Sequence, residues 1–217
     1  MIINIDKPIG WSSFDVVKKV KNITKHNKVG HGGTLDPFAS GVLIIGTELD
    51  TKKLTGITNS DKVYEARLEL GKTTNTLDTE GEVINTMEIP EFDSVKIKSV
   101  LNKFLGKQKQ KPPMYSAKKH NGVRLYKLAR KNIEVDRDCI DIFVHNIELV
   151  DYSKNVIRFI LECSKGTYVR VLGKDIANKL KTVGYLTALK RTRVGDYLIS
   201  DSLSIDGFQN KWKSIHH

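Results

Sequence analysis

The segment from Gly30 to Leu43 is rich in glycine and small residues and carries a single carboxylate, Asp36. The three glycines before Asp36 permit backbone angles and close approaches that a side chain would block, and Pro37 biases Asp36 toward an extended conformation. An Asp-Pro pair by itself is typical of a turn. A lone carboxylate in such a setting costs free energy unless it is paired with another group, so its presence here indicates a partner or a role in catalysis. The segment therefore predicts a rigid corner that presents Asp36 for chemistry.

The composition fits one basic domain without metal. A chain of 217 residues with 39% hydrophobic residues can build one substantial core, so we expect a single domain over residues 1–217. The 36 Lys and Arg residues outnumber 25 Asp and Glu, and the resulting net charge of +11 suits a polyanionic partner. Cys139 and Cys163 lack the number and spacing of a disulfide framework or a zinc site. No signal peptide or membrane-spanning run is present, which predicts a cytoplasmic protein without a membrane partner.

A basic segment near residues 102–132 contains no acidic residue. It also carries Tyr115, Tyr126 and His120, which offer packing surfaces for bases or riboses. This combination favours an RNA-contacting surface. A second basic cluster is a candidate continuation of the same surface, and its members are Lys179, Lys181, Lys190, Arg191 and Arg193.

A helix is expected after Ser12 and Ser13, which can cap its N-terminus. Phe14, Val17 and Val20 recur every three residues and predict its buried stripe. We expect this helix to support the Gly30–Leu43 segment.

Two further segments show clear periodicity. Residues 63–70 alternate, which predicts a strand with Tyr64 on its apolar face. Residues 94–105 predict an amphipathic helix capped by Gly106, and its apolar stripe is Ile97, Val100, Leu101, Phe104 and Leu105.

The C-terminal half adds an expected strand pair and a helix. Residues 140–149 and 156–163 alternate on either side of a polar turn at 151–155, which predicts an antiparallel pair. Leu172, Ile176 and Leu180 are spaced for one face of a helix. The fold class is therefore α+β, with a central mixed, mostly antiparallel sheet flanked by helices.

Six elements, which match in the order in which they occur, give the chain its resemblance to a known family. They are Asp6–Ser13, Gly30–Leu43, Lys62–Tyr64, Gly71–Gly81, Gln110–Lys118 with Gly122–Tyr126, and Cys163–Arg170. Together they resemble the TruB family, the tRNA pseudouridine-55 synthases, over nearly the whole chain. The resemblance implies the pseudouridine-synthase fold and isomerisation of uridine 55 in the T-loop of tRNA. The reaction needs no cofactor, and tRNA, through its T-arm, is the expected partner, with no obligate protein partner evident.

The resemblance also assigns the catalytic residues. Asp36 matches the essential aspartate, acting either as a nucleophile or as a base in cleaving the glycosidic bond. Arg170 matches the cation that keeps this aspartate charged. Tyr168 lies two residues before Arg170, so in an extended segment both would face one pocket. Tyr64 matches the tyrosine that stacks on the flipped base, and it is a candidate for proton transfer at carbon 5.

The remaining matches are assigned to substrate binding. Tyr168 packs on the other side of the base, and Leu189 forms an apolar wall. Asp78 contacts the target nucleotide, although an Asp here is equally typical of a turn. Lys7 orients Tyr64 or a phosphate. His31 fills the gap left by the flipped uridine, with a structural role and a proton-transfer role as the alternatives.

The sequence departs from the family at several places. Gly184-Tyr185-Leu186 replaces an Ala-His element, Ser40 replaces a frequent threonine, and Lys190 stands where an arginine is usual. Little sequence follows Leu203, so no full C-terminal PUA domain is expected. The competing hypotheses are a related synthase with another RNA target and a tRNA-binding or tRNA-folding protein. A hydrolase is disfavoured because no Gly-x-Ser-x-Gly segment occurs.

Overall fold

The computed structural model describes residues 1–216, which form two compact units. Unit 1 contains residues 1–64 and the described residues from 189 onward, and unit 2 contains residues 65–188. Two strands, β4 (Lys62–Leu70) and β12 (Gly184–Val194), run from one unit into the other. A single catalytic domain over residues 1–217 stays a prediction, and residue 217 lies outside the described residues.

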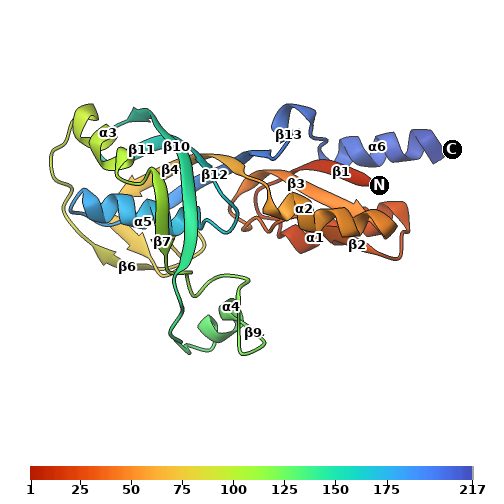
Figure 1. The fold of residues 1–217 in the computed structure, drawn as a ribbon, viewed down its shortest axis with the longest axis horizontal. Helices are drawn as coiled ribbons and strands as arrows, with labels where there is room; N and C mark the ends of the chain where they lie inside the picture. Colours follow the sequence, from red (N-terminus) through yellow and green to blue (C-terminus); the bar gives the residue numbers. More distant parts are fainter. Residues whose placement is uncertain (217) are drawn as a thin grey trace. The chain divides into compact units, whose positions relative to one another are not determined.

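Unit 1 is built around β3 (Figure 1). This strand pairs antiparallel with β1 and β2 and parallel with β12, and β13 extends β12 as an antiparallel partner. The elements of unit 1 are β1 (Ile2–Lys7), α1 (Ser13–Thr24), β2 (Val29–His31), β3 (Ser40–Thr47), η1 (Glu48–Lys53), α2 (Leu54–Asn59), β13 (Tyr197–Leu198), η2 (Ile199–Asp201) and α6 (Ile205–His216).

The core of unit 1 follows from the alternation of β3. Leu43 and Ile45 belong to the apolar cluster that includes α1 and α6, whereas Val42 and Ile44 belong to the cluster with Leu54 of α2. Successive strand residues point to opposite faces, so one strand supplies both clusters. Each of these side chains is fully buried, and burial of one such side chain is worth about 1.5–3 kcal/mol.

Helix α1 begins as the sequence predicts, but its buried stripe differs. The Ser12 side chain accepts a hydrogen bond from the Asp15 amide, and the Asp15 carboxylate accepts one from the Ser12 amide, which completes a capping box. Val16, Val17 and Val20 are buried, whereas Phe14 is 61% exposed. The prediction for Phe14 was wrong because a three-residue repeat drifts around a helix of 3.6 residues per turn.

Unit 2 holds the other part of the sheet, with neighbouring strands in the order β12, β4, β11, β10 and β7. The predicted antiparallel pair is confirmed as β10 (Ile140–Tyr152) and β11 (Val156–Cys163). β10 runs further than expected, and two irregularities in its register accommodate the extra length. The period-two pattern of β4 is also confirmed, since Tyr64, Ala66, Leu68 and Leu70 are buried.

Two helices pack in unit 2, α3 (Ser94–Asn102) and α5 (Val169–Lys179). α3 ends earlier than predicted, Leu105 is exposed, and Gly106 starts β7 (Gly106–Gln110) instead of capping the helix. The positive φ of 81° at Gly106 turns the chain into the strand. Beside α5, a Cβ at Gly184 would lie 2.8 Å from Ala177 Cβ, so glycine permits the close helix–strand contact.

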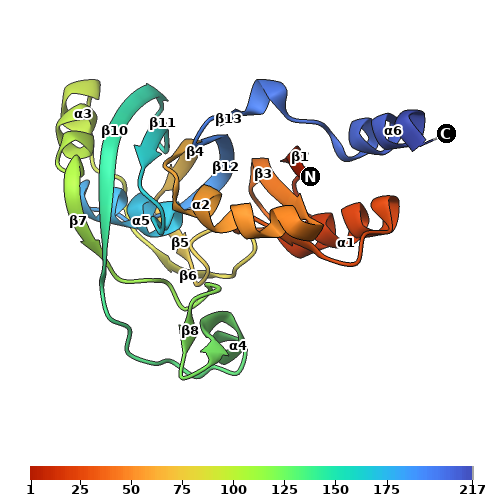
Figure 2. The same cartoon turned by 45° about the vertical axis from the view of Figure 1, so that its right-hand side comes forward.

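Two small strand pairs complete unit 2. β5 (Lys72–Thr74) pairs with β6 (Val83–Thr86), and β8 (Lys119–His120) pairs with β9 (Val123–Arg124) ahead of α4 (Leu125–Ala129). In Figures 1 and 2, the β8–β9–α4 segment lies off the ends of β7 and β10. The part of the basic segment that follows β7 therefore projects from the sheet of unit 2.

The α+β prediction is confirmed. The sheet is mixed, since β3 and β12 are parallel while the β1–β3, β10–β11 and β7–β10 pairs are antiparallel, and helices flank it. Within residues 1–216, no helix is long and apolar enough to cross a membrane.

Candidate active site

Asp36 lies in the loop between β2 and β3 of unit 1 and is half-buried. The Ala39 amide donates to the Asp36 carbonyl at 3.1 Å, and the Gly10 amide donates to the Pro37 carbonyl at 2.8 Å. Both bonds fix the backbone that directly follows the Asp36 Cα, so the loop is a defined corner, as the sequence predicts.

Lys7 secures this corner from β1. Its side chain is fully buried, and its Nζ donates to the Trp11 carbonyl at 2.6 Å, the Pro8 carbonyl at 2.8 Å and the Pro37 carbonyl at 3.5 Å. A buried ammonium needs such acceptors because the low-dielectric interior penalises an unsatisfied charge. These contacts favour a positioning role for Lys7 over the predicted contact with a phosphate.

Helix α1 supports the same loop through Ser13. The Ser13 hydroxyl donates to the Leu35 carbonyl at 3.0 Å and accepts from the Leu35 amide at 2.8 Å. Both side chains are buried, so these bonds are shielded from water. The expectation that α1 supports the Asp36 loop is confirmed.

Arg191 of β12 holds the loop from the sheet. Its Nε donates to the Val42 carbonyl at 2.8 Å, Nη1 to the Thr34 carbonyl at 3.3 Å and Nη2 to the Gly33 carbonyl at 3.1 Å. Arg191 is only 1% exposed. Its inclusion in a second RNA-contacting surface was therefore wrong, because its planar guanidinium is occupied by the carbonyls that precede and follow Asp36.

Gly41 allows Arg191 to come this close. It is the register partner of Arg191 in the parallel β3–β12 pair, and its φ is +106°. A Cβ on Gly41 would overlap the Arg191 backbone. Only glycine fits this conformation and this approach without strain.

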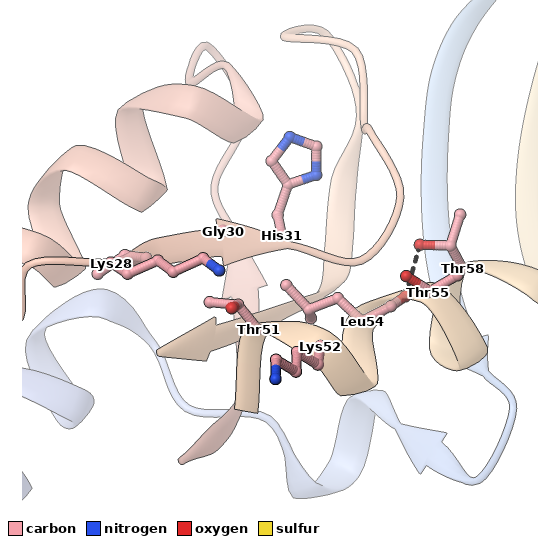
Figure 3. Close-up of a pocket in the computed structure, with 9 residues that line it drawn as sticks. Lys28, Gly30, His31, Thr51, Lys52, Leu54, Thr55 and Thr58 are labelled. Carbon is pink, nitrogen blue, oxygen red and sulfur yellow. Dashed lines mark hydrogen bonds between the residues drawn. The ribbon is translucent and has the colours of Figure 1, made fainter. Parts of the chain in front are cut away.

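The other predicted residues of unit 1 lie on three strands. Tyr64 on β4 and Leu189 on β12 are buried, and His31 on β2 is half-buried. His31 also lines a shallow pocket of about 380 Å³ with residues of η1 and α2. In Figure 3 its imidazole points away from Leu54 and Lys52, which lie on the other side of the strand.

In unit 2, Arg170 and Asp78 form a buried ion pair with 3.2 Å between Arg170 Nη1 and Asp78 Oδ2. Arg170 also donates to the Thr76 carbonyl at 2.6 Å and the Tyr115 carbonyl at 2.7 Å. Asp78 further accepts from the Thr76 hydroxyl at 2.6 Å and the Glu80 amide at 2.9 Å. These contacts favour Asp78 as the residue that orients Arg170, and a contact of Asp78 with the nucleotide stays a prediction.

Tyr168 precedes α5 as its N-cap residue, and Arg170 lies inside the helix. The two residues do not share an extended segment, so that part of the prediction was wrong: the alternation rule of strands does not apply across a helix start. Gln110 at the end of β7 fixes the position of Tyr168. Its side chain accepts from the Tyr168 amide at 2.8 Å and donates to the Tyr168 carbonyl at 3.1 Å.

We expect Gln110→Leu to lower stability by about 1–3 kcal/mol, because the amide and carbonyl of Tyr168 lose the buried side chain that pairs with both. Chemical denaturation measures the change. Gln108→Leu is the matched control, since Gln108 lies half-buried on the same strand and its contacts to Lys103 and Leu105 are 3.4 Å long. Equal midpoints for the two variants would contradict the role of Gln110.

The family follows from the chain's similarity to known proteins. A family model described as the TruB family pseudouridylate synthase N-terminal domain matches residues 21–169. The chain belongs to the TruB family.

The similarity to relatives extends over nearly the whole of this TruB-family chain. A tRNA pseudouridine synthase B from Ureaplasma urealyticum serovar 10 is 42% identical over 221 residues, covering 99% of this chain and 95% of the relative. One from Clostridium kluyveri is 46% identical over 205 residues, covering 94% and 71%. The match therefore includes every predicted site residue from Lys7 to Leu189 in a chain of similar length.

Solved structures support the TruB fold. The protein in a Cbf5-Nop10-Gar1 complex aligns with a TM-score of 0.76 at 27% identity, covering 100% of this chain and 56% of that one. A chain in an H/ACA RNP bound to a substrate RNA aligns with a TM-score of 0.73 at 24% identity. The chain spans about half the length of these solved relatives, 56% and 55%.

Part of the basic segment of this TruB chain is already paired within the protein. Lys111 bonds Asp136 at 2.6 Å and Lys107 lies 3.4 Å from Asp141. Both pairs are exposed, so they are weak and can exchange for phosphate contacts. Among residues 1–216, no group of three or more His, Cys, Asp or Glu side chains could hold a metal ion.

Proposed function

We propose that this TruB-family protein is a tRNA pseudouridine synthase that isomerises uridine 55 in the T-loop of tRNA. The observation that carries the proposal is the Asp36 corner, in which Lys7, Ser13 and Arg191 all bind backbone and fix the loop. The relatives named tRNA pseudouridine synthase B support the substrate class.

The chemistry requires a carboxylate in a fixed place. The N1–C1′ glycosidic bond of uridine breaks, the base turns, and C5 bonds to C1′, after which the C5 proton leaves and N1 gains one. Asp36 acts as the nucleophile or the base that starts this sequence. Because the backbone of the loop is fixed, the Asp36 carboxylate needs little rearrangement to reach the reacting atom of the substrate.

The assignments of Arg170, Tyr64, Tyr168, Leu189 and His31 stay predictions from the resemblance. Arg170 is the cation beside Asp36, Tyr64 and Tyr168 hold the base, and Leu189 forms the apolar wall. His31 occupies the space left by the flipped nucleotide. The ion pair with Asp78 supports the role of Arg170, because it fixes the guanidinium before substrate arrives.

The shape of the RNA supplies selectivity. A uridine pocket cannot distinguish one uridine from another, whereas a bent loop lowers the cost of flipping the base. The T-arm therefore carries the information that selects uridine 55. A tRNA substrate also implies a cytoplasmic site of action.

Tritium release from carbon 5 of a uridine-labelled tRNA transcript tests the proposal, with the modified position mapped afterwards. We expect release that maps to uridine 55. Release at another position would keep the chemistry and change the substrate. Tight binding without release from any transcript would support the competing hypothesis of a tRNA-binding or tRNA-folding protein.

A further inference from the structure

We propose that α1 and α6 form a second RNA-binding surface, which takes the ribose-phosphate backbone of a duplex stem outside the target loop. The proposal rests on the proposed function for the class of its partner, RNA. It concerns residues that neither the active-site assignment nor the basic segment at 102–132 includes. The lysine face defined below is its structural basis.

The exposed side of α1 and the turn after it is rich in lysine. Lys18, Lys21 and Lys25 are spaced by three and four residues, which places them on one face of the helix, opposite the buried valines. Lys19 lies at the edge of this face, and Lys28 follows in the turn before β2. Helix α6 packs against α1 and adds one further lysine, and the lysine face comprises Lys18, Lys19, Lys21, Lys25, Lys28 and Lys213.

Two shallow grooves run through this lysine face. The first, of about 410 Å³, is lined by Lys18, Lys19 and Asn22 together with Gly10, Trp11 and Asp15. The second, of about 350 Å³, is lined by Lys19, Asn22, Ile23, Gln209, Trp212 and Lys213. Lys19 and Asn22 line both grooves, so the two adjoin. Amide side chains between ammonium groups supply hydrogen bonds to phosphates and 2′-hydroxyls.

The charge of this face is not neutralised within the protein. Among residues 1–216, no ion pair within 4.0 Å joins a lysine of the face to a carboxylate. Asp15 is the acidic residue of α1, and the Ser12 hydroxyl and amide hold it as part of the capping box. Asp206 is the acidic residue of α6 and lies in its first turn. Five of the six lysines of the face are therefore exposed and Lys19 is half-buried, and Asp15 is the carboxylate that lines the first groove with them.

Phe14 gives this face a further feature. Its exposed ring lies beneath Lys18, with the Nζ 5.3 Å from the ring centroid. A cation–π contact of this kind restrains the ammonium on the surface. The exposure of Phe14, which the sequence did not predict, thus has a use in orienting Lys18 toward a ligand.

The face is connected to the active-site loop. The N-terminus of α1 carries Ser13, which bonds Leu35 beside Asp36. A helix of 12 residues spans about 18 Å, so RNA that enters the Asp36 loop can continue along the lysines of α1. A duplex fits better than a single strand because only Phe14 is largely exposed, while the described Trp11 and Trp212 are half-buried, so the rings do not form a row of stacking platforms.

RNA also fits better than an acidic protein. A stable protein interface has an apolar centre with charged residues at its rim. Here ammonium and amide groups line both grooves beside a few apolar side chains. Of these, Trp212 already packs against Phe208 and His26, with ring centroids 6.2 Å and 5.5 Å away. Polar and positive surfaces of this kind are typical of protein–nucleic acid contacts.

The test compares two triple variants of the full chain in binding to a tRNA transcript over a range of KCl concentrations. The first carries Lys18→Gln, Lys19→Gln and Lys213→Gln, which line the grooves. The matched control carries Lys96→Gln, Lys98→Gln and Lys154→Gln, three exposed lysines of unit 2. Glutamine keeps the length of the side chain, and thermal melting checks that both variants fold.

We expect the first variant to bind about tenfold or more weakly near 0.1 M salt and to lower the slope of log Kd against log salt by about 2–3, since each lysine released from a phosphate contributes nearly one. The control keeps the wild-type slope. Equal slopes for the two variants would show that the lysine face does not bind RNA. That result is also the one expected if the face binds an acidic protein. Tritium release by the wild-type protein reports the proposed function separately. If no tritium is released, a difference between the two variants in the salt dependence of tRNA binding still supports the proposed RNA-binding surface.

Discussion

Replacing Asp36 by asparagine is expected to reduce tritium release from tRNA by more than about 10³-fold. Asparagine keeps the shape of the side chain but can act neither as a nucleophile nor as a base, and loss of one such group costs about 10²–10⁴-fold or more. The loop itself should persist, because Lys7, Ser13 and Arg191 donate to backbone carbonyls and Ser13 also accepts from the Leu35 amide, none of which the substitution removes. The affinity for tRNA should therefore change little.

Asp138→Asn is the matched control, since Asp138 is an exposed aspartate in the segment between α4 and β10. It makes the same chemical change without touching the loop, so its rate should equal that of the wild-type protein. Release by Asp36→Asn within tenfold of the wild-type rate would show that another group starts the reaction. A parallel loss of affinity would instead show that asparagine disturbs the loop.

Local patterns in the sequence predicted much of the fold. The alternation of β4 and of the β10–β11 pair and the serine cap of α1 each depend on residues close together in the chain. The errors lie where a pattern ends. Phe14 kept a three-residue spacing outside the buried stripe, and Tyr168 stands at the boundary where an extended segment becomes a helix.

The buried charges were harder to anticipate. Lys7 and Arg191 were interpreted as substrate or surface cations, because lysine and arginine are seldom fully buried without partners. The partners of Lys7 are the nearby carbonyls of Pro8 and Trp11 together with that of Pro37, 30 residues away. The partners of Arg191 are carbonyls 149–158 residues away. The alternation of β12 carried a signal for Arg191, which lies on the same face as the buried Leu189. No comparable sequence pattern indicated that the side chain of Gln110 binds the backbone of Tyr168.

These contacts give the Asp36 corner a common design. A lysine, a serine and an arginine from three different elements all bind the backbone of one glycine-rich loop, and Gly41 makes room for the arginine. Glycines make the corner possible but also make it entropically costly to order. Side chains that bind carbonyls offset this cost and fix the backbone that carries Asp36.

Replacing Arg191 by methionine should therefore affect both stability and rate. The variant leaves the carbonyls of Gly33, Thr34 and Val42 without their buried donor, and we expect a loss of about 3–5 kcal/mol in the free energy of unfolding. Urea denaturation measures it. The control is Arg158→Met, which removes an exposed pair with Asp151, so its cost should be below about 1 kcal/mol.

The kinetic effect separates positioning from simple loss of folding. At a temperature where the Arg191→Met protein is fully folded, we expect kcat to fall by about 10²-fold, because a small displacement of a reacting group is enough for such a loss. KM for tRNA should stay near the wild-type value, since the guanidinium is enclosed by backbone and does not reach the RNA. Arg191→Lys should recover little, because one ammonium cannot reproduce the planar fork that binds three carbonyls. A raised KM with unchanged kcat would instead place Arg191 in the RNA-binding surface.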